Sequence, residues 1–360
     1  MSLSSEELQR YSRQLALTTI GEQGQRHLKN AHVGVIGVGG LGCFSAVQLA
    51  AMGVGSLTLV DQDVVDITNL HRQILYETRH VGYPKVEIAQ KKLRALNPHL
   101  HINALPITIN EATASSVVKD VDIIIDGLDR LQPRYAINKA CNEHHIPYIY
   151  AGALETYGNV STILPGETAC LACYLGTVTD EGLPTCETAG VLTPILAIIA
   201  SIQVSEAIHL ILGQAPALLG KVLFIDVNSL SFTNLEIQRR EDCPVCGTTT
   251  TPNHQQTIDT KIVALCGKDS FMASPHHPLE IDLTDAIIAL KNHYTVTLQS
   301  ELGLALMTPT GVSINLMKTG NALLKGITTE KDAQTIYTQL LNHLAPLPKP
   351  QSKQLSVPDA

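Results

Sequence analysis

The sequence predicts a doubly wound α/β fold built on a mostly parallel, Rossmann-like sheet. A short β-branched run at 33–37 ends in glycines, an apolar helix is expected over 41–52, and a second strand over 56–61. This order of strand, glycine turn, helix and strand is a βαβ unit, which implies a parallel sheet. Hydrophobic residues make up 44% of the chain and charged residues 16%, a composition that suits a globular core.

The other elements of the large sheet follow from the same periodicity. Polar amphipathic helices are expected over 4–30. Two later strands, at 159–165 and 221–227, leave antiparallel pairing open. Between these segments, strands and helices alternate, with strands expected at 101–107, 121–126 and 146–152 and helices at 84–96 and 133–144.

A Thr-rich polar run at 246–257 interrupts this pattern and indicates a domain boundary. We predict a large α/β domain over 1–250, a small C-terminal α+β domain over 258–345 and a Pro-rich, disordered tail over 346–360. The small domain is expected to contain strands at 261–265, 294–298, 304–307 and 312–316 and helices at 283–291 and 330–344.

Charge and hydropathy limit the possible partners. Lys and Arg number 25 against 33 Asp and Glu, a net charge of −8, whereas a general nucleic-acid binder would carry a basic stripe. The apolar stretch 191–212 resembles a membrane span, but it contains Gln203, Glu206 and His209, and charge inside a bilayer is costly. We interpret it as a buried core helix. No nucleic-acid or membrane partner is therefore expected.

The cellular compartment decides whether the cysteines are expected to form disulfides or to remain thiols. Residues 1–14 lack the apolar segment of a secretory signal, so the reducing cytoplasm is expected. In that compartment a cysteine cluster more often binds metal or carries out chemistry than forms disulfides.

A glycine-rich loop follows the first strand and opens the first long helix. Gly37, Gly39, Gly40 and Gly42 allow a tight turn and let the backbone approach a phosphate at the positive helix N-terminus. Asp61 ends the next strand, where a carboxylate can accept hydrogen bonds from ribose hydroxyls. The pattern indicates a nucleotide site but does not choose between NAD and ATP. A tight turn with no ligand is the simpler alternative.

The residues that follow favour ATP. A hydride-transfer site needs no Arg72 or Lys85 beside the phosphates, whereas a site that breaks a triphosphate must neutralise charge on the bridging and leaving oxygens. Either cation alone would be interpreted as a solvated surface charge. Asp126 and Asp129 close another strand at the same sheet edge, where a carboxylate could hold Mg²⁺.

Five of the eight cysteines lie where they could bind metal or take part in chemistry. Cys186 lies on a loop before the apolar helix, a setting that lowers the pKa of a thiol. It is either a nucleophile or a cysteine without a chemical role. Two CxxC pairs, separated by 69 residues, suit a closed tetrahedral zinc site; two redox pairs or unrelated cysteines are the alternatives. The paired residues are Cys170, Cys173, Cys243 and Cys246, while Cys43, Cys141 and Cys266 are expected to be buried small residues.

These segments together resemble the ThiF/MoeB/HesA family, the bacterial relatives of ubiquitin-activating enzymes. The matching pieces, in family order between about residues 10 and 247, are RYSRQL, GVGGLG, DQDVVDITNLHRQ, GYPK, DGLDR, the CxxC pairs and TCETAGVLTP. The resemblance implies an adenylyltransferase that uses ATP to convert the C-terminal Gly-Gly carboxylate of a ubiquitin-like sulfur-carrier protein to an acyl-adenylate, releasing pyrophosphate. Such carriers serve thiamin or molybdopterin synthesis, with a sulfurtransferase as a possible sulfur donor.

The resemblance also implies roles for individual residues. Arg72 and Lys85 would stabilise charge during attack on the α-phosphorus, and Asp129 would ligate Mg²⁺. Arg13 would reach into the partner subunit's site of a homodimer. Cys186 matches a loop cysteine that some members use for a covalent step with the carrier or its sulfur donor. The four paired cysteines would bind structural zinc, and ATP would contact Gly37, Gly39, Gly40, Gly42, Asp61, Asp63, Asn69, Arg72, Gln73, Lys85 and Asp129.

The sequence departs from the family pattern in three places. His71 replaces a usual Asn, and Arg130 follows Asp129 where a small polar residue is common. The C-terminal segment lacks the Cys-x₄-Arg loop of a rhodanese and is instead similar to a small domain appended to certain prokaryotic members.

Two other functions stay open. A related adenylating enzyme could act on a ribosomal peptide or a tRNA base, although such relatives often lack a loop cysteine or add an N-terminal peptide-binding domain. A non-catalytic scaffold is the third class. Such a scaffold would have no need for Arg13, Arg72, Lys85 and Asp129.

Overall fold

The chain divides into two compact units, Met1–His254 and Gln255–Ala360. The structure is a computed structural model that describes residues 2–176, 178–186, 188–247, 260–264 and 269–344. The tail expected over 346–360, Cys266 and most of the Thr-rich run lie outside the described residues.

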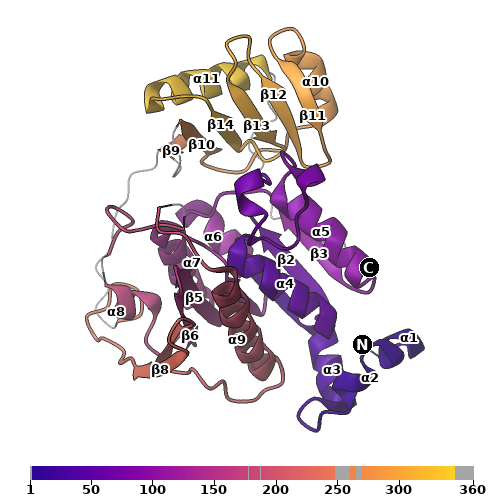
Figure 1. Cartoon of the computed structure of the whole chain (residues 1–360), viewed down its shortest axis with the longest axis vertical. Helices are drawn as coiled ribbons and strands as arrows, with labels where there is room; N and C mark the ends of the chain where they lie inside the picture. The colour runs from indigo at the N-terminus through magenta and orange to yellow at the C-terminus, as the bar shows by residue number, and fades with distance from the viewer. Residues whose placement is uncertain (1, 177, 187, 248–259, 265–268, 345–360) are drawn as a thin grey trace. The chain divides into compact units, whose positions relative to one another are not determined.

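The first unit is built on one eight-stranded sheet with the order β3-β2-β1-β4-β5-β6-β7-β8 (Figure 1). The first five strands in this order run parallel, and the other three are antiparallel. The order reverses between β1 and β4, where open α/β sheets bind their ligands. The strands are β1 His32–Ile36, β2 Ser56–Val60, β3 His101–Leu105, β4 Ile123–Asp126, β5 Tyr148–Leu154, β6 Tyr157–Ile163, β7 Lys221–Asp226 and β8 Ser231–Glu236. The predicted doubly wound α/β fold is confirmed.

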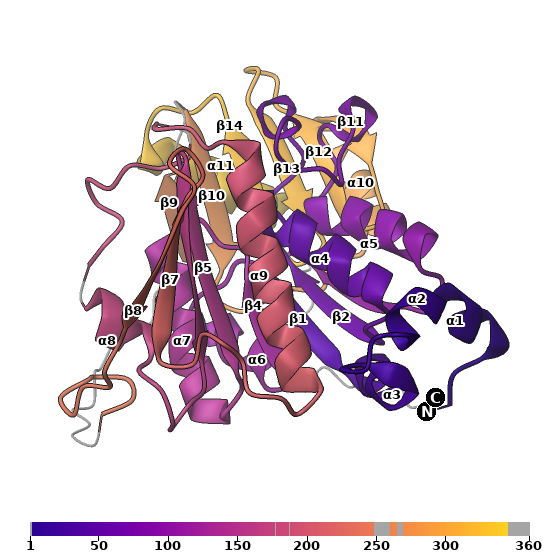
Figure 2. The ribbon, with the colours of Figure 1, turned by 60° about the horizontal axis from the view of Figure 1, so that its bottom comes forward.

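Helices cover both faces of this sheet (Figure 2). On one face α4 packs against α9 and the central strands, with α5 over β2 and β3; on the other face α6 packs against α7. These helices are α4 Gly40–Met52, α5 Lys85–Leu96, α6 Glu111–Val118, α7 Leu131–His144 and α9 Thr193–Ile211. The β-branched strands are buried on both sides, which explains their nearly continuous apolar sequence.

Helix α9 is, among the described residues, the one helix long and apolar enough to cross a membrane. It packs against α4, β5 and β6, and two of its polar side chains, Gln203 and Glu206, are bonded inside the unit. Gln203 Nε2 donates to the carbonyl oxygens of Asp126 (2.9 Å) and Ile149 (3.0 Å). Glu206 accepts from Thr162 Oγ1 at 2.7 Å. These contacts are those of the buried core helix expected from the sequence.

The second unit is a six-stranded antiparallel sheet with the order β11-β12-β13-β14-β10-β9. Its core includes side chains from the sheet and from both helices, α10 Leu283–Leu290 and α11 Glu330–His343. The predicted α+β architecture agrees with this arrangement, although two of its strands, β10 and β14, were not predicted. The strands are β9 Thr260–Ala264, β10 Ser270–Pro275, β11 Thr295–Gln299, β12 Gly303–Met307, β13 Ser313–Met317 and β14 Ala322–Lys325.

Candidate nucleotide site and cysteine cluster

The glycine loop joins β1 to α4 and requires its glycines for close packing. Gly37 has a φ of +86°, and its N–H donates to the carbonyl oxygen of Val60 at 2.7 Å. A Cβ at Gly42 would lie 1.9 Å from the Gly37 carbonyl oxygen. Gly39 precedes α4 with no side-chain cap from the described residues. The first N–H groups of α4 are therefore available to an anion such as a phosphate.

Asp61 ties the end of β2 to this loop. Its Oδ2 accepts from the N–H of Val38 and its Oδ1 from the N–H of Asp63, both at 2.8 Å. Burial raises the pKa of Asp61 to about 6, although Lys85 works in the opposite direction. Each carboxylate oxygen keeps a lone pair that could accept a ribose hydroxyl.

Lys85 supplies a buried positive charge beside the loop. Its Nζ lies 3.0 Å from Oδ2 of Asp63, and its side chain is only 6% exposed. Burial lowers the pKa of Lys85, but the carboxylates of Asp63 and Asp61 outweigh it and hold the pKa above its ordinary value. Lys85 is therefore charged at neutral pH, with further N–H donors beyond the one aimed at Asp63.

The segment between Asp63 and Lys85 presents Asn69, Arg72 and Gln73. The backbone oxygen of Asn69, in the short helix η1 (Ile67–Asn69), accepts from the N–H groups of Arg72 and Gln73 at 3.1 and 3.0 Å. Arg72 Nη1 donates to the Thr68 carbonyl oxygen at 3.0 Å. Gln73 is only 4% exposed and faces Gly39, yet its Oε1 has no partner among the described residues. Such an unsatisfied buried amide fits a site completed by a ligand.

The two aspartates after β4 have different surroundings. Asp126 is buried and accepts from Arg134 Nε (3.0 Å), Tyr148 OH (2.5 Å) and the Leu128 N–H (2.8 Å). It therefore anchors the loop. Asp129 is exposed at the end of the same loop and acts electrostatically on Lys85. Of the two, only Asp129 has a carboxylate without a hydrogen-bond partner among the described residues, as a Mg²⁺ ion beside phosphates would need.

The two CxxC pairs come together into one cluster. Cys170 precedes the short helix α8 (Leu171–Leu175), and its Sγ lies 3.6 Å from Sγ of Cys243. The sulfurs of Cys173 and Cys246 are 3.4 Å apart, and all four lie within 4.8 Å of one another. A tetrahedral zinc with bonds of about 2.3 Å would place its sulfurs about 3.8 Å apart. Four converging thiols fit one structural metal site better than two separate redox pairs, and they are not unrelated cysteines.

Cys186 does not have the lowered pKa expected from the sequence. Its half-buried Sγ lies 3.7 Å from the Ala153 carbonyl oxygen. Burial and Asp129 raise the pKa of Cys186, and Arg72 and Arg134 only partly offset them. The expectation was wrong because α9 begins at Thr193, well beyond the first turn over which a helix dipole acts. Cys43 and Cys141 are buried, as predicted.

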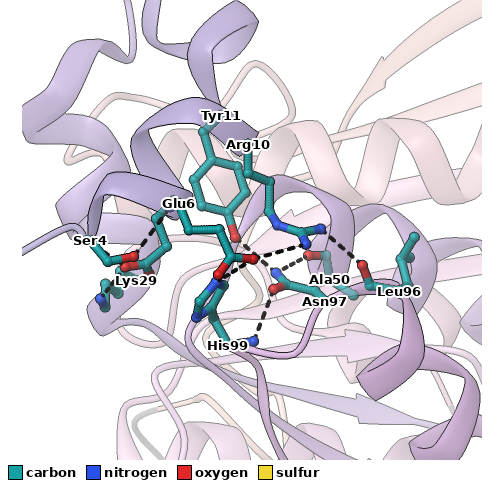
Figure 3. Close-up of polar contacts among 10 residues, drawn as sticks. Ser4, Glu6, Arg10, Tyr11, Lys29, Ala50, Leu96, Asn97 and His99 are labelled. Carbon is teal, nitrogen blue, oxygen red and sulfur yellow. Dashed lines mark hydrogen bonds and ion pairs between the residues drawn. The ribbon is translucent and has the colours of Figure 1, made fainter.

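Arg13 lies apart from the loop residues, on α2 (Ser12–Leu15), after α1 (Ser5–Arg10) and before α3 (Gly21–Asn30). In the described part of the chain it is exposed and has no hydrogen bond or ion pair. Its neighbours, however, are firmly anchored (Figure 3). The Asn97 amide donates to Tyr11 OH and to the Ala50 carbonyl oxygen, both at 2.8 Å, and Arg10 donates to the Leu96 carbonyl oxygen at 3.0 Å.

The structure thus brings most of the predicted site residues close to one another. Asp61, Asp63 and Lys85 are in contact beside the glycine loop, and Asp129 and Arg72 lie within electrostatic reach of Cys186. Sequence reasoning missed Arg134, which fixes the loop after β4. In the sequence, Arg134 is marked by its place as a lone arginine in the helix that follows the DGLDR motif. The exposed His71 contributes its backbone oxygen, which accepts from Thr193 Oγ1 at 3.0 Å.

An open α/β sheet with a glycine loop, a buried lysine and convergent carboxylates at its switch point defines a nucleotide-binding protein, here with a separate four-cysteine cluster. Residues 11–245 match the ThiF family. The chain belongs to this family.

Named relatives cover most of the chain. Sulfur carrier protein adenylyltransferase of Thermus thermophilus is 36% identical, over 74% of this chain and 99% of that protein. Molybdopterin-synthase adenylyltransferase of Escherichia coli is 35% identical, over 68% and 98%. Sulfur carrier protein ThiS adenylyltransferase of Bacillus subtilis is 31% identical, over 91% and 98%, so its match extends into the second unit.

A solved structure of MccB from Escherichia coli has the same fold. It aligns with a TM-score of 0.60 and 26% identity, over 71% of this chain and 76% of that one. A structure of MccB with ATP aligns with a TM-score of 0.58 and 27% identity, over 66% and 74%.

Proposed function

We propose that the protein is an ATP-dependent adenylyltransferase that activates the C-terminal Gly-Gly carboxylate of a ubiquitin-like sulfur-carrier protein of the thiamin or molybdopterin type. The observation that carries the proposal is the buried Lys85, held by Asp63 beside a glycine loop and an uncapped helix N-terminus. The names of the relatives, at 31–36% identity, support the same activity.

The chemistry is nucleotidyl transfer. A carrier carboxylate oxygen forms a bond to the α-phosphorus of ATP while the bond from that phosphorus to the bridging oxygen of pyrophosphate breaks. Lys85 and Arg72 neutralise the charge that grows on the phosphate oxygens. Asp61 accepts the ribose hydroxyls, while Asn69 and Gln73 complete the phosphate site. Mg²⁺, held by Asp129, would neutralise further phosphate charge.

The other assignments complete the proposal. The first unit carries adenylation. Cys170, Cys173, Cys243 and Cys246 bind structural zinc. The enzyme is a cytoplasmic homodimer in which Arg13 completes the site of the partner subunit. Cys186 forms a covalent link in one of two ways: its thiolate displaces AMP from the carrier acyl-adenylate to give a thioester, or it attacks the outer sulfur of a persulfide on the sulfurtransferase donor and releases the donor thiolate. The raised pKa of Cys186 means that carrier or donor binding must activate its thiol.

ATP–pyrophosphate exchange tests this function. Radiolabelled pyrophosphate should enter ATP only when a Gly-Gly-ended carrier is present, and a carrier shortened by its last glycine should give none. Absence of exchange with every thiamin-type and molybdopterin-type carrier would contradict the proposal.

The alternative substrate is a ribosomal peptide. It is favoured by the structural match to MccB, one solved form of which is in complex with N-formylated MccA. Identity to that form is 26%, below the 31–36% shared with the named carrier adenylyltransferases. Exchange with a short peptide but with no folded carrier would select this alternative.

A further inference from the structure

Asn138 lies in the middle of α7, beside the start of the short helix α8 and the cysteine cluster. It is fully buried, and α7 packs against α8. Its Oδ1 accepts from the N–H of Leu171 at 2.9 Å. Cys170, the residue before α8, provides no side-chain cap, so an amide from another helix satisfies this N–H. Asn138 thus holds the residue next to the first cysteine of the cluster.

The other end of the same amide has no partner. Nδ2 of Asn138 is buried and makes no hydrogen bond with the described residues. Turning the amide over would not help, because the N–H of Leu171 would then face the NH₂ group. A buried donor without an acceptor is costly, and an apolar side chain of similar size would serve packing better. The amide at this position therefore calls for an acceptor beside Nδ2.

The candidate for that acceptor is the sulfur of Cys170, the chain neighbour of Leu171. Burial raises the pKa of the Cys170 thiol, and the Asn138 side chain is one of the groups that act against this rise. An N–H donor has this effect only where it can reach the sulfur and stabilise its negative form. Nδ2 of Asn138 therefore lies within reach of Cys170 Sγ.

The state of the sulfur decides how well it accepts a hydrogen bond. A thiol sulfur is a weak acceptor, which agrees with the unpartnered Nδ2. A metal-bound cysteine is a thiolate, and hydrogen bonds to a charged acceptor are about twice as strong as neutral ones. The four sulfurs of the cluster lie within 4.8 Å of one another, as one metal ion requires. The unsatisfied amide and the set of thiols thus fit the same group.

Another sulfur of the cluster already has a contact of this kind. The backbone N–H of Arg240 donates to Sγ of Cys173 at 3.4 Å. Such outer partners orient metal ligands and stabilise their charge, and their loss weakens metal binding by roughly 10–100-fold. Asn138 is placed to supply the equivalent donor to Cys170.

We propose that Asn138 is a positioning residue of the zinc site. Its Nδ2 donates to the Cys170 thiolate of the loaded cluster, while its Oδ1 keeps the N–H of Leu171. The side chain thus orients Cys170 and stabilises the negative charge of its sulfur. This role rests on the zinc assignment within the proposed function, and it does not depend on which substrate is adenylated.

Two substitutions separate the donor of Asn138 from its acceptor. Asn138→Asp keeps an oxygen for the Leu171 N–H and replaces the amide donor with a carboxylate oxygen. Asn138→Leu removes both polar atoms and keeps a similar volume. The matched control is Asn142→Asp, because Asn142 lies one turn further along α7 and its Nδ2 donates to the backbone oxygen of Asn138 at 2.8 Å.

Zinc affinity and a spectroscopic signature of the sulfurs are measured on the full-length protein at about pH 8, where an ordinary carboxyl group is ionised. Competition with a chelating dye gives the Kd for Zn²⁺, which should rise about 10–100-fold in both Asn138 variants. In the Co²⁺-substituted protein, the sulfur-to-metal charge-transfer band should move to longer wavelength, because the thiolate has lost a donor that stabilises its electrons. Asn142→Asp should change neither the Kd nor the band.

The possible results separate the donor from a purely structural role. A wild-type Kd and band position in Asn138→Asp would overturn the proposal, because Oδ1 alone would then account for the residue. A weaker affinity with an unmoved band would also overturn it, since the substitutions would then only loosen α8. If Asn138→Leu does not fold, Asn138→Asp decides alone, because it retains the bond to Leu171. A wild-type protein that binds neither Zn²⁺ nor Co²⁺ would overturn the zinc assignment as well, whereas adenylation is tested separately by ATP–pyrophosphate exchange.

Discussion

The ion pair between Lys85 and Asp63 shows how single residues set the electrostatics of the site. Asp61, Asp63 and Asp129 all act on this one buried lysine, so three carboxylates surround a single ammonium group. In the proposed reaction the phosphates of ATP add negative charge, which Lys85 and Arg72 would both offset. Asp63 also fixes Lys85 before ATP binds, which reduces the cost of ordering a long side chain.

Replacing Lys85 tests its role in the transition state. Lys85→Met should lower the kcat of exchange by about 10²–10³-fold, the cost of losing one preorganised donor. Lys91→Met is the matched control, because Lys91 lies on the same helix but pairs with Glu87 at 2.8 Å on a half-exposed side. A rise in the KM for ATP with an unchanged kcat would contradict this role and indicate binding alone.

The pKa of Asp61 predicts a pH dependence of nucleotide binding. Because that pKa is raised to about 6, the carboxylate becomes protonated as the pH falls through 6 and loses acceptor capacity for the ribose hydroxyls. Adenosine affinity, measured by titration between pH 5 and 8, should therefore fall below pH 6. Adenosine avoids the titration of the ATP phosphates.

The contribution of Asp61 to folding stability changes with pH in the opposite direction to its contribution to adenosine binding. The folded-state pKa of Asp61 is raised, so this group stabilises the fold fully below its unfolded pKa of 3.8 and loses that contribution as the pH rises through about 6. Asp61→Asn should remove both the pH dependence of adenosine affinity and that of stability. If the fall in adenosine affinity below pH 6 persists in this variant, another group causes it.

At the scale of elements, the sequence indicated those with strong local patterns and missed those without. The continuous β-branched runs of β1 and β4 were predicted to within two residues. β8 was missed because all six of its residues are exposed, so no apolar alternation marks it. α6 was missed because its small residues form no apolar stripe, although the Asn110 side chain caps it by accepting from the N–H groups of Ala112 and Thr113.

The same division applies to the site. The glycine loop and the Asp63–Lys85 segment are local motifs, and their residues were found. The burial of Cys186 depends on a contact between distant segments, its Sγ beside the Ala153 carbonyl oxygen of β5, which no local spacing reveals. Arg134 lies only eight residues after its partner Asp126, but no motif in the sequence pairs the two.

The cysteine cluster joins two distant elements and should stabilise the first unit. Cys243→Ser should abolish binding of one zinc per chain, measured by elemental analysis, and lower the melting temperature by about 10 °C because metal binding contributes directly to folding. Cys186→Ser is the control and should keep both the zinc and the melting temperature. Loss of neither in Cys243→Ser would contradict a structural metal site.

At the scale of the whole molecule, the exposed position of Arg13 raises the question of whether one chain or two form a site, and we propose two. The anchors around it, Tyr11 to Asn97 and Gln14 to the Met52 carbonyl oxygen, hold α2 in place and leave the Arg13 side chain exposed. The helix that carries Arg13 is fixed, but the Arg13 guanidinium has no partner among the described residues, so it suits a role outside its own chain.

Subunit complementation tests this arrangement directly. Arg13→Ala and Lys85→Met should each be inactive alone, because each removes a cation from every site. When the two are unfolded together, mixed in equal amounts and refolded, half of the dimers contain one chain of each kind. If Arg13 acts across the interface, each mixed dimer has one site with both cations intact and one with neither. Exchange activity should then recover to about one quarter of the wild-type rate. If Arg13 served its own chain, every site would lack one cation and no activity would return.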